Sequence, residues 1–151
     1  MLNSDDINQK LKLILASEYY EGDFGDTIAD IKLILSNVDD KDIKKSIPTD
    51  YVEFIQKFGF GELDESFYIE DGPAPYEDIY KSQIDKLKGS YVIASDMSEF
   101  SYLIDSSNGW RVIQVDSQGG PSGIVYENFS VFIDNKLDEI VSAVKWRIEN
   151  F

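Results

Sequence analysis

Apolar residues in the first part of the chain recur at helical spacing. Ser4, followed by two acids, predicts a helix N-cap, and Gly22 and Gly25 interrupt the pattern. The spacing predicts a helix from Ser4, a second from Asp26 or Thr27, a third over 39–47 and a fourth over 49–59. The fourth is the clearest, because its apolar side chains recur at i, i+3, i+4 and i+7 from Tyr51 and Gly59 follows as a stop.

After Gly59 the periodicity changes to the short β-branched and aromatic runs that are typical of strands. We expect strands over residues 67–69, 91–95, 100–105, 110–116 and 123–126, a turn over 71–73 and a helix over 76–88. The pair Asn108-Gly109, between two of these strands, favours positive φ at a hairpin turn. The middle of the chain is therefore expected to form a sheet.

A single apolar stripe predicts a long helix over residues 128–150. Its members step by four or three residues: Phe129, Ile133, Leu137, Ile140, Val144, Ile148 and Phe151. At about 100° per residue, Trp146 lies about 140° from the centre of this stripe. We therefore expect Trp146 to be exposed as an interface anchor. A helix that is covered on two sides would bury it instead.

Helices come first, strands cluster in the middle and a long helix follows. This order predicts an α+β fold, in which a mostly antiparallel central sheet is packed by N-terminal helices and a long C-terminal helix. With 151 residues, no internal repeat and no obvious linker, the chain is expected to form one domain over residues 1–151.

The chain contains neither cysteine nor histidine, which excludes disulfides, thiolate nucleophiles and catalysis by Ser-His-Asp or Cys-His arrangements. We expect no bound metal and no cofactor. Asp and Glu number 29 against 14 Lys and Arg, so the net charge is −15, and nucleic acid or an anionic membrane would repel the protein. With no visible signal peptide or long apolar run, we expect a cytoplasmic location.

The negative charge is concentrated in the centre of the chain. No basic residue lies between Lys57 and Lys81, whereas seven acids do. Tyrosines interleave with these acids, and tyrosine beside carboxylate is a common mixture at protein interfaces. We predict a surface that binds a basic protein partner, made of Glu62, Asp64, Glu65, Tyr68, Glu70, Asp71, Tyr76, Glu77, Asp78 and Trp146. A uniform solubilising coat of charge is the plainer alternative.

Other kinds of chemistry have less support in the residue pattern. The many carboxylates leave open a hydrolase that uses an acid–base pair, although the sequence sets no distance between two such groups. Gly59-Phe60-Gly61 lacks the strand and third glycine of a dinucleotide-binding loop, and the Ser-x-x-Lys pattern at Ser142 lacks its companion motifs. Lysines crowd the acids at 39–42, which suits a helix N-terminus better than a calcium loop.

The segment over residues 47–59 resembles the SUKH superfamily. In that superfamily an apolar residue and a proline open a helix that carries an aromatic residue, an apolar pair and a closing glycine. The matching positions are Ile47-Pro48, Tyr51, Phe54-Ile55 and Gly59. The likeness spans residues 26–135, and it departs at residues 97–100, where the family often carries glycines.

This resemblance implies an α+β domain without a shared catalytic site. Many bacterial members are immunity proteins that protect a cell from polymorphic or contact-dependent toxins, often nucleases, and fungal relatives regulate cell-wall synthesis. We therefore expect a non-catalytic immunity protein that binds and neutralises a basic cognate toxin through its acidic surface. The alternative is a regulatory or scaffold domain that binds a cellular protein or a small ligand.

Overall fold

An antiparallel sheet forms the centre of the molecule. The computed structural model describes residues 2–65, 67–80, 85–96 and 99–151. Within them, six strands pair in sequence order: β1 (Gly61–Asp64), β2 (Phe67–Pro75), β3 (Ser90–Ser95), β4 (Ser101–Asp105), β5 (Arg111–Val115) and β6 (Pro121–Tyr126). The helices are α1 (Ser4–Leu15), α2 (Ile31–Ile34), α3 (Lys41–Ser46), α4 (Thr49–Lys57), α5 (Tyr76–Ile79) and α6 (Phe129–Asn150), with a 3₁₀ turn at Asp85–Leu87. The predicted α+β class and its arrangement are confirmed.

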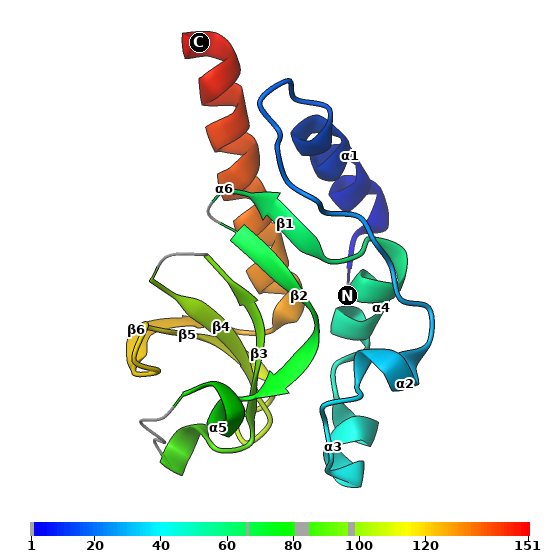
Figure 1. The fold of residues 1–151 in the computed structure, drawn as a ribbon, viewed down its shortest axis with the longest axis vertical. Helices are drawn as coiled ribbons and strands as arrows, with labels where there is room; N and C mark the ends of the chain where they lie inside the picture. The colour runs from blue at the N-terminus through cyan, green and yellow to red at the C-terminus, as the bar shows by residue number, and fades with distance from the viewer. Residues whose placement is uncertain (1, 66, 81–84, 97–98) are drawn as a thin grey trace.

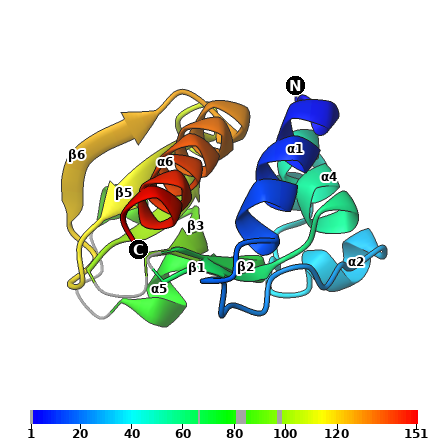
Figure 2. The same ribbon diagram turned by 90° about the horizontal axis from the view of Figure 1, so that it is seen from above.

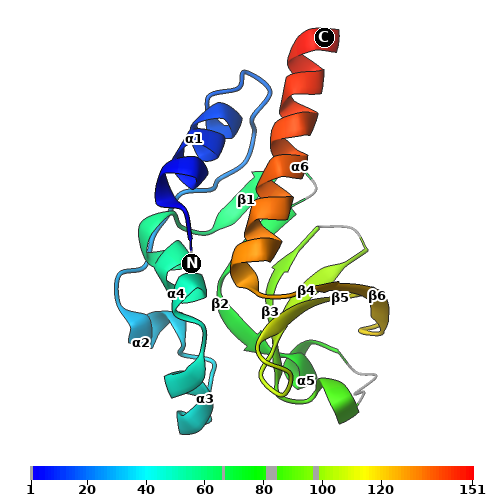
Figure 3. The ribbon, with the colours of Figure 1, turned by 180° about the vertical axis from the view of Figure 1, so that it is seen from behind.

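The larger part of the core lies between the sheet and the helices α1, α4 and α6, which Figures 2 and 3 show on the same side of the molecule. Aromatic rings dominate the contact. Phe129 meets the ring of Tyr51 edge-on at 5.3 Å, and Phe132 lies 4.9 Å from the ring of Tyr102. Because each buried ring contributes about 1.5–3 kcal/mol, these pairs bind α6 firmly to α4 and to the sheet.

A smaller apolar cluster covers the opposite face of the sheet, under α5. Tyr76 is fully buried there with Leu87 and side chains of β3, β4 and β5. Its hydroxyl donates to the carbonyl oxygen of Gly119 at 2.7 Å. A Cβ on Gly119 would lie 2.7 Å from the ring of Tyr80, so this turn requires glycine. Both faces of the middle strands are therefore buried.

The apolar stripe of α6 is confirmed as far as Val144 and is wrong beyond it. Its members up to Val144 are buried, whereas Ile148 is 56% exposed and Phe151 is 74% exposed. Figure 1 shows the reason: the C-terminal turns of α6 extend past the sheet. Apolar side chains on those turns have no strand beneath them.

Several local predictions differ from the structure. The α1 helix is capped by Asn3 rather than Ser4, because Oδ1 of Asn3 accepts the Asp6 backbone N–H at 3.1 Å. The expected turn over 71–73 lies inside β2, and β1 was not expected at all. The expected helix over 76–88 is α5 and a 3₁₀ turn, with residues 81–84 outside the described part of the chain.

The second expected helix is a single turn. It runs only from Ile31 to Ile34, because Asp30 caps it by accepting the backbone N–H of Lys32 at 2.9 Å. Its apolar residues divide between core and solvent, since Ile34 is buried and Leu33 is 63% exposed. The residues before it, 27–30, are not helical, so the expected start at Asp26 or Thr27 is wrong.

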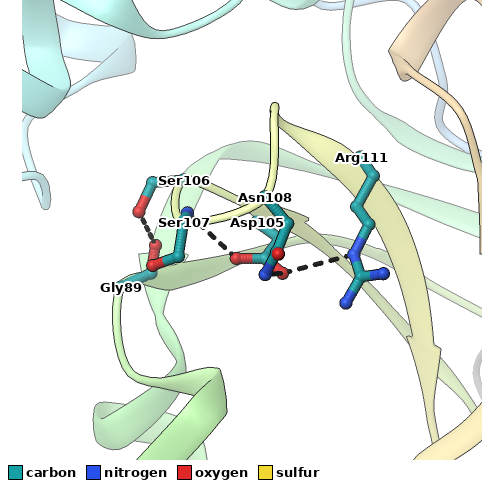
Figure 4. A network of polar contacts seen from close by, with 6 residues as sticks. All are labelled: Gly89, Asp105, Ser106, Ser107, Asn108 and Arg111. Carbon is teal, nitrogen blue, oxygen red and sulfur yellow. Dashed lines mark hydrogen bonds and ion pairs between the residues drawn. The ribbon is translucent and has the colours of Figure 1, made fainter.

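A buried carboxylate closes the hairpin between β4 and β5. Asp105 is 1% exposed and accepts the Ser107 backbone N–H at 3.1 Å, the Asn108 amide at 2.8 Å and Arg111 Nε at 3.4 Å (Figure 4). The positive φ angles fall one residue later than the Asn-Gly pair suggests, at Gly109 and Trp110. Asn108 does not adopt a positive φ; it contributes to the turn through its side-chain amide, which donates to Asp105.

Candidate functional site

The predicted interface acids do not form one surface. Glu62, Asp64 and Glu65 lie at the β1–β2 hairpin. Tyr68, Glu70 and Asp71 lie within β2, and Glu77 and Asp78 lie on α5. Figure 1 shows α5 at the opposite end of the molecule from the C-terminal end of α6. These residues therefore do not share a single face that one partner could cover.

Two of the predicted residues are buried. Tyr76 has no exposed surface, and its hydroxyl is used within the fold by Gly119, so it is not an interface anchor. Asp64 is 8% exposed and forms a two-bond ion pair with Arg147 of α6, with distances of 3.0 and 3.4 Å. The carboxylate of Asp64 therefore holds β1 to α6.

Trp146 is exposed, as predicted from its angle to the stripe, and it does not stand alone. Its side chain is 57% exposed and meets the ring of Phe151 edge-on at 5.6 Å. Phe151 also meets the ring of Tyr19 edge-on at 5.7 Å. Three aromatic rings from the C-terminal end of α6 and from the loop after α1 thus share one surface.

Carboxylates surround these rings. Glu18, Glu21 and Glu65 are exposed beside them and line a hollow of about 510 Å³ together with Trp146 and Phe151. Ala143 and Arg147 line the same hollow, and we call the other six lining residues the apical surface: Glu18, Tyr19, Glu21, Glu65, Trp146 and Phe151. A second hollow of about 130 Å³ adjoins it, and Glu62 and Asp64 line that one. Of the predicted residues, the fold therefore gathers Glu62, Asp64, Glu65 and Trp146.

The loop that follows α1 is held in place by β1. The Tyr20 hydroxyl donates to the carbonyl oxygen of Glu62 at 2.9 Å and accepts the Phe24 N–H at 2.8 Å. Oδ1 of Asp23 accepts the backbone N–H of Glu62 at 2.7 Å. Gly22 permits this approach, because a Cβ there would lie 2.0 Å from the Glu62 carbonyl oxygen. These bonds position Glu18, Tyr19 and Glu21 beside α6.

The electrostatics of the apical surface favour a cation. Hydrogen bonding to Asp64, with the nearby charge of Glu65, raises the pKa of Arg147 above its usual value. Partial desolvation and the charge of Glu18 raise the pKa of Tyr19. Arg147 is the one cation among the described residues that line the two hollows. The region can therefore offer aromatic faces and carboxylates together to a positively charged group.

The acids along β2 form a separate, partly buried group. Tyr68 faces Glu62 across the β1–β2 ladder. Burial, and then the charges of Glu70, Asp23 and Asp71, raise the pKa of the Tyr68 hydroxyl. Burial and the charge of Asp71 likewise raise the pKa of Glu70. This group has no exposed apolar ring comparable with Trp146, so it is the weaker candidate.

Sequence reasoning missed Tyr19, Glu18, Glu21 and Phe151. The signal that points to Tyr19 is the run Glu18-Tyr19-Tyr20-Glu21, which mixes acids with aromatic residues just after a helix. Phe151 was assigned to the buried stripe, because its spacing matches the stripe and the sequence does not reveal where the sheet ends.

Two general features of the described residues bear on other classes of site. No three of the side chains in the described ranges are grouped so as to hold a metal ion. Among the helices of the same ranges, none has both the length and the apolar character needed to span a membrane.

No protein-family model matches the sequence, and no curated protein matches it at a significant level.

Proposed function

We propose that this chain is a non-catalytic binding protein of the SUKH type, an immunity protein that neutralises a basic toxin by covering it with the apical surface. The observation that carries this proposal is the position of the exposed rings of Trp146 and Phe151 among exposed glutamates. Large exposed apolar side chains with an acidic surround favour a protein partner over solvent exposure alone.

Each component of the apical surface has a physical role in such binding. The rings of Tyr19, Trp146 and Phe151 supply contact area, and their faces attract the guanidinium or ammonium groups of a basic protein. The carboxylates of Glu18, Glu21 and Glu65 lie where they can pair with the same groups. The net charge of −15 accelerates the encounter with a basic partner at low ionic strength.

The choice of an immunity protein rests on the SUKH resemblance together with the fold. The residues that carry the resemblance form α4, which begins at Thr49 directly after Pro48 and is followed by Gly59 with a φ of 109°. The buried faces of Tyr51 and Phe54 are the aromatic and apolar positions of the family pattern. An α+β domain with the helix order described above is compatible with that family.

The first test is whether a large protein is encoded beside this gene. If one is, its C-terminal domain is co-expressed with this chain, and the result is scored by survival of the host and by co-purification. We expect survival and a stable complex. A double charge reversal on the apical surface, Glu18→Arg with Glu65→Arg, should weaken the complex by about 10–100-fold and most strongly at low salt.

The matched control is the pair Glu77→Arg with Asp78→Arg, which changes the net charge equally on α5 at the other end of the molecule. We expect this control to bind almost as the native protein does. If the two double variants weaken the complex equally, the apical surface is not the binding face. If the neighbouring domain is not toxic or does not bind, the immunity role is wrong and a regulatory or scaffold domain becomes the better account.

A further inference from the structure

The two edge strands of the sheet, β1 and β6, differ in whether their outer backbone groups are bonded to other parts of the chain. At the β1 edge, both backbone groups of Glu62 are occupied by side chains, since Asp23 accepts from its N–H and Tyr20 donates to its carbonyl oxygen. Such capping prevents another strand from pairing with that edge. The β6 edge lies on the outside of the molecule, with no element beside it in Figures 1 and 2.

The β6 edge lacks comparable protection along the described chain. Among the described residues, the one bond from a side chain to a β6 backbone group is local, from the Ile124 N–H to Ser122 Oγ at 3.3 Å. Ile124 is 48% exposed and Val125 is 49% exposed, so two neighbouring apolar side chains flank the open edge. An exposed apolar edge strand is a template for pairing with another strand.

Charge decides which strand fits. Two copies of a chain with net charge −15 repel each other wherever acids face acids. Residues 117–126 contain no charged residue, and β6 lies within this stretch. The β6 edge is therefore a surface where two copies can approach closely at small electrostatic cost, whereas a basic partner gains nothing from an uncharged edge.

We propose that β6 pairs antiparallel with β6 of a second copy of this chain, so that the two sheets join across a two-fold axis. With the axis at Val125, this residue faces Val125 of the second copy, and Ile124 faces Tyr126 of the second copy. In that register Glu127 faces Gly123, so no carboxylate faces a carboxylate. This assignment is independent of the proposed function, since no residue of β6 belongs to the apical surface.

The strand limits the strength of this dimer. Gly123 has a φ of 98°, and the β5–β6 register shifts nearby, so only the segment from Ile124 onward is regular enough to pair. A short ladder with two apolar contacts per copy forms a small interface, for which a dissociation constant on the order of 10 μM is expected. Repulsion between the acidic bodies should make the dimer tighter at high salt, by about tenfold between 0.02 and 0.5 M NaCl.

Sedimentation equilibrium of the full chain tests the proposal. The weight-average mass should rise from 17.2 kDa towards twice that value as the concentration reaches about 300 μM, and earlier at high salt. Ile124→Glu should abolish the rise, because it places two carboxylates beside the two-fold axis. Val125→Glu should do the same, so a folding defect in one variant does not decide the outcome.

Leu33→Glu is the control, because it adds the same charge at an exposed apolar residue on α2, away from β6. We expect it to dimerise as the native chain does. A native protein that stays monomeric at all salt concentrations overturns the proposal. A dimer that persists in both β6 variants overturns it as well, since the contact then lies elsewhere on the molecule.

Discussion

Arg147 of α6 donates to both carboxylate oxygens of Asp64 in β1, at 3.0 and 3.4 Å, across 83 positions of sequence. Both residues line the smaller of the two hollows at the apical surface, and Arg147 lines the larger one as well. It joins the C-terminal half of α6 to the outer strand of the sheet. Trp146 and Phe151 lie at the end of α6 and Glu65 directly follows β1, so half of the apical surface is carried by the two elements that this pair connects.

Asp64→Asn should therefore destabilise the protein. Asp64 is 8% exposed and the Arg147 side chain is 22% exposed, so the loss is reduced by solvent and is expected to be about 1–3 kcal/mol of unfolding free energy. Urea denaturation measures it. Lys57→Met, which breaks an exposed pair with Glu53, is the control and should cost less than about 0.5 kcal/mol. Equal effects of the two substitutions would contradict a structural role for Asp64.

Ser130→Ala tests the contact between the starts of α6 and α4. The Ser130 hydroxyl donates to Oδ2 of Asp50 at 2.6 Å, and Ser130 is 8% exposed. Removing it leaves a partly buried carboxylate oxygen without this donor, and we expect a loss of about 1–2 kcal/mol in thermal or urea unfolding. Ser46→Ala is the control, because its exposed hydroxyl bonds only to carbonyls of its own helix. A loss no larger than in that control would argue against the contact.

Tyr76→Phe separates the buried role of this residue from the interface role predicted from sequence. The substitution keeps the ring and removes the hydroxyl that donates to Gly119, so we expect a loss of about 1 kcal/mol in unfolding free energy. Partner binding should be unchanged, because the side chain has no exposed surface. Weakened binding with unchanged stability is the result that would restore Tyr76 to the interface.

Glu70→Gln should stabilise the protein at neutral pH. Burial, and to a lesser degree the charge of Asp71, raises the pKa of Glu70 in the folded state. A carboxyl whose pKa is higher when folded opposes folding while it is ionised, and this cost disappears as the pH falls below the unfolded pKa. The variant should therefore exceed the native protein in unfolding free energy near about pH 7, with a difference that shrinks in acid.

Urea titrations at several pH values check this expectation. Glu149→Gln removes the same charge at an exposed position on α6 and controls for the general effect of net charge. A Glu70→Gln variant that is less stable than native protein at neutral pH would mean that the carboxylate is used favourably in the fold.

The field around Trp146 can be measured without a partner. In a Trp110→Phe background Trp146 is the remaining tryptophan, and its 57% exposure makes it accessible to ionic quenchers. Because Glu18, Glu21 and Glu65 lie close by, the ratio of caesium quenching to iodide quenching at low salt should be at least about twofold higher for Trp146 than for a free, uncharged tryptophan derivative. Glu65→Arg should reduce that preference. A ratio equal to that of the free derivative would mean that the carboxylates do not create the expected field.

Elements with one strong period were predicted closely. The α4 helix, the long α6 helix and the strands β3, β4 and β5 begin and end within one or two residues of the expected positions. The β1 strand was missed, because its four residues, Gly61 to Asp64, include two acids and carry little local preference for a strand. It exists through its pairing with β2 and through the bonds to Glu62, which no local pattern reveals.

The candidate site was predicted only in part. The angle of Trp146 on its helix is a local property, and its exposure followed from that angle. The grouping of acids by sequence proximity failed, because β2 and the turn into α5 carry Glu77 and Asp78 to the far end of the molecule. Tyr19 and Phe151 become neighbours because the loop after α1 is held against β1.

By itself the sequence determined the class of the fold, the net charge, the absence of thiol and imidazole chemistry and the face of α6 that carries Trp146. These properties depend on composition or on positions a few residues apart. The tertiary structure decided which acids share a surface, which tyrosines are buried and where α6 leaves the sheet. Those outcomes depend on contacts such as that between Asp64 and Arg147, whose partners lie far apart in sequence and meet only when the chain has folded.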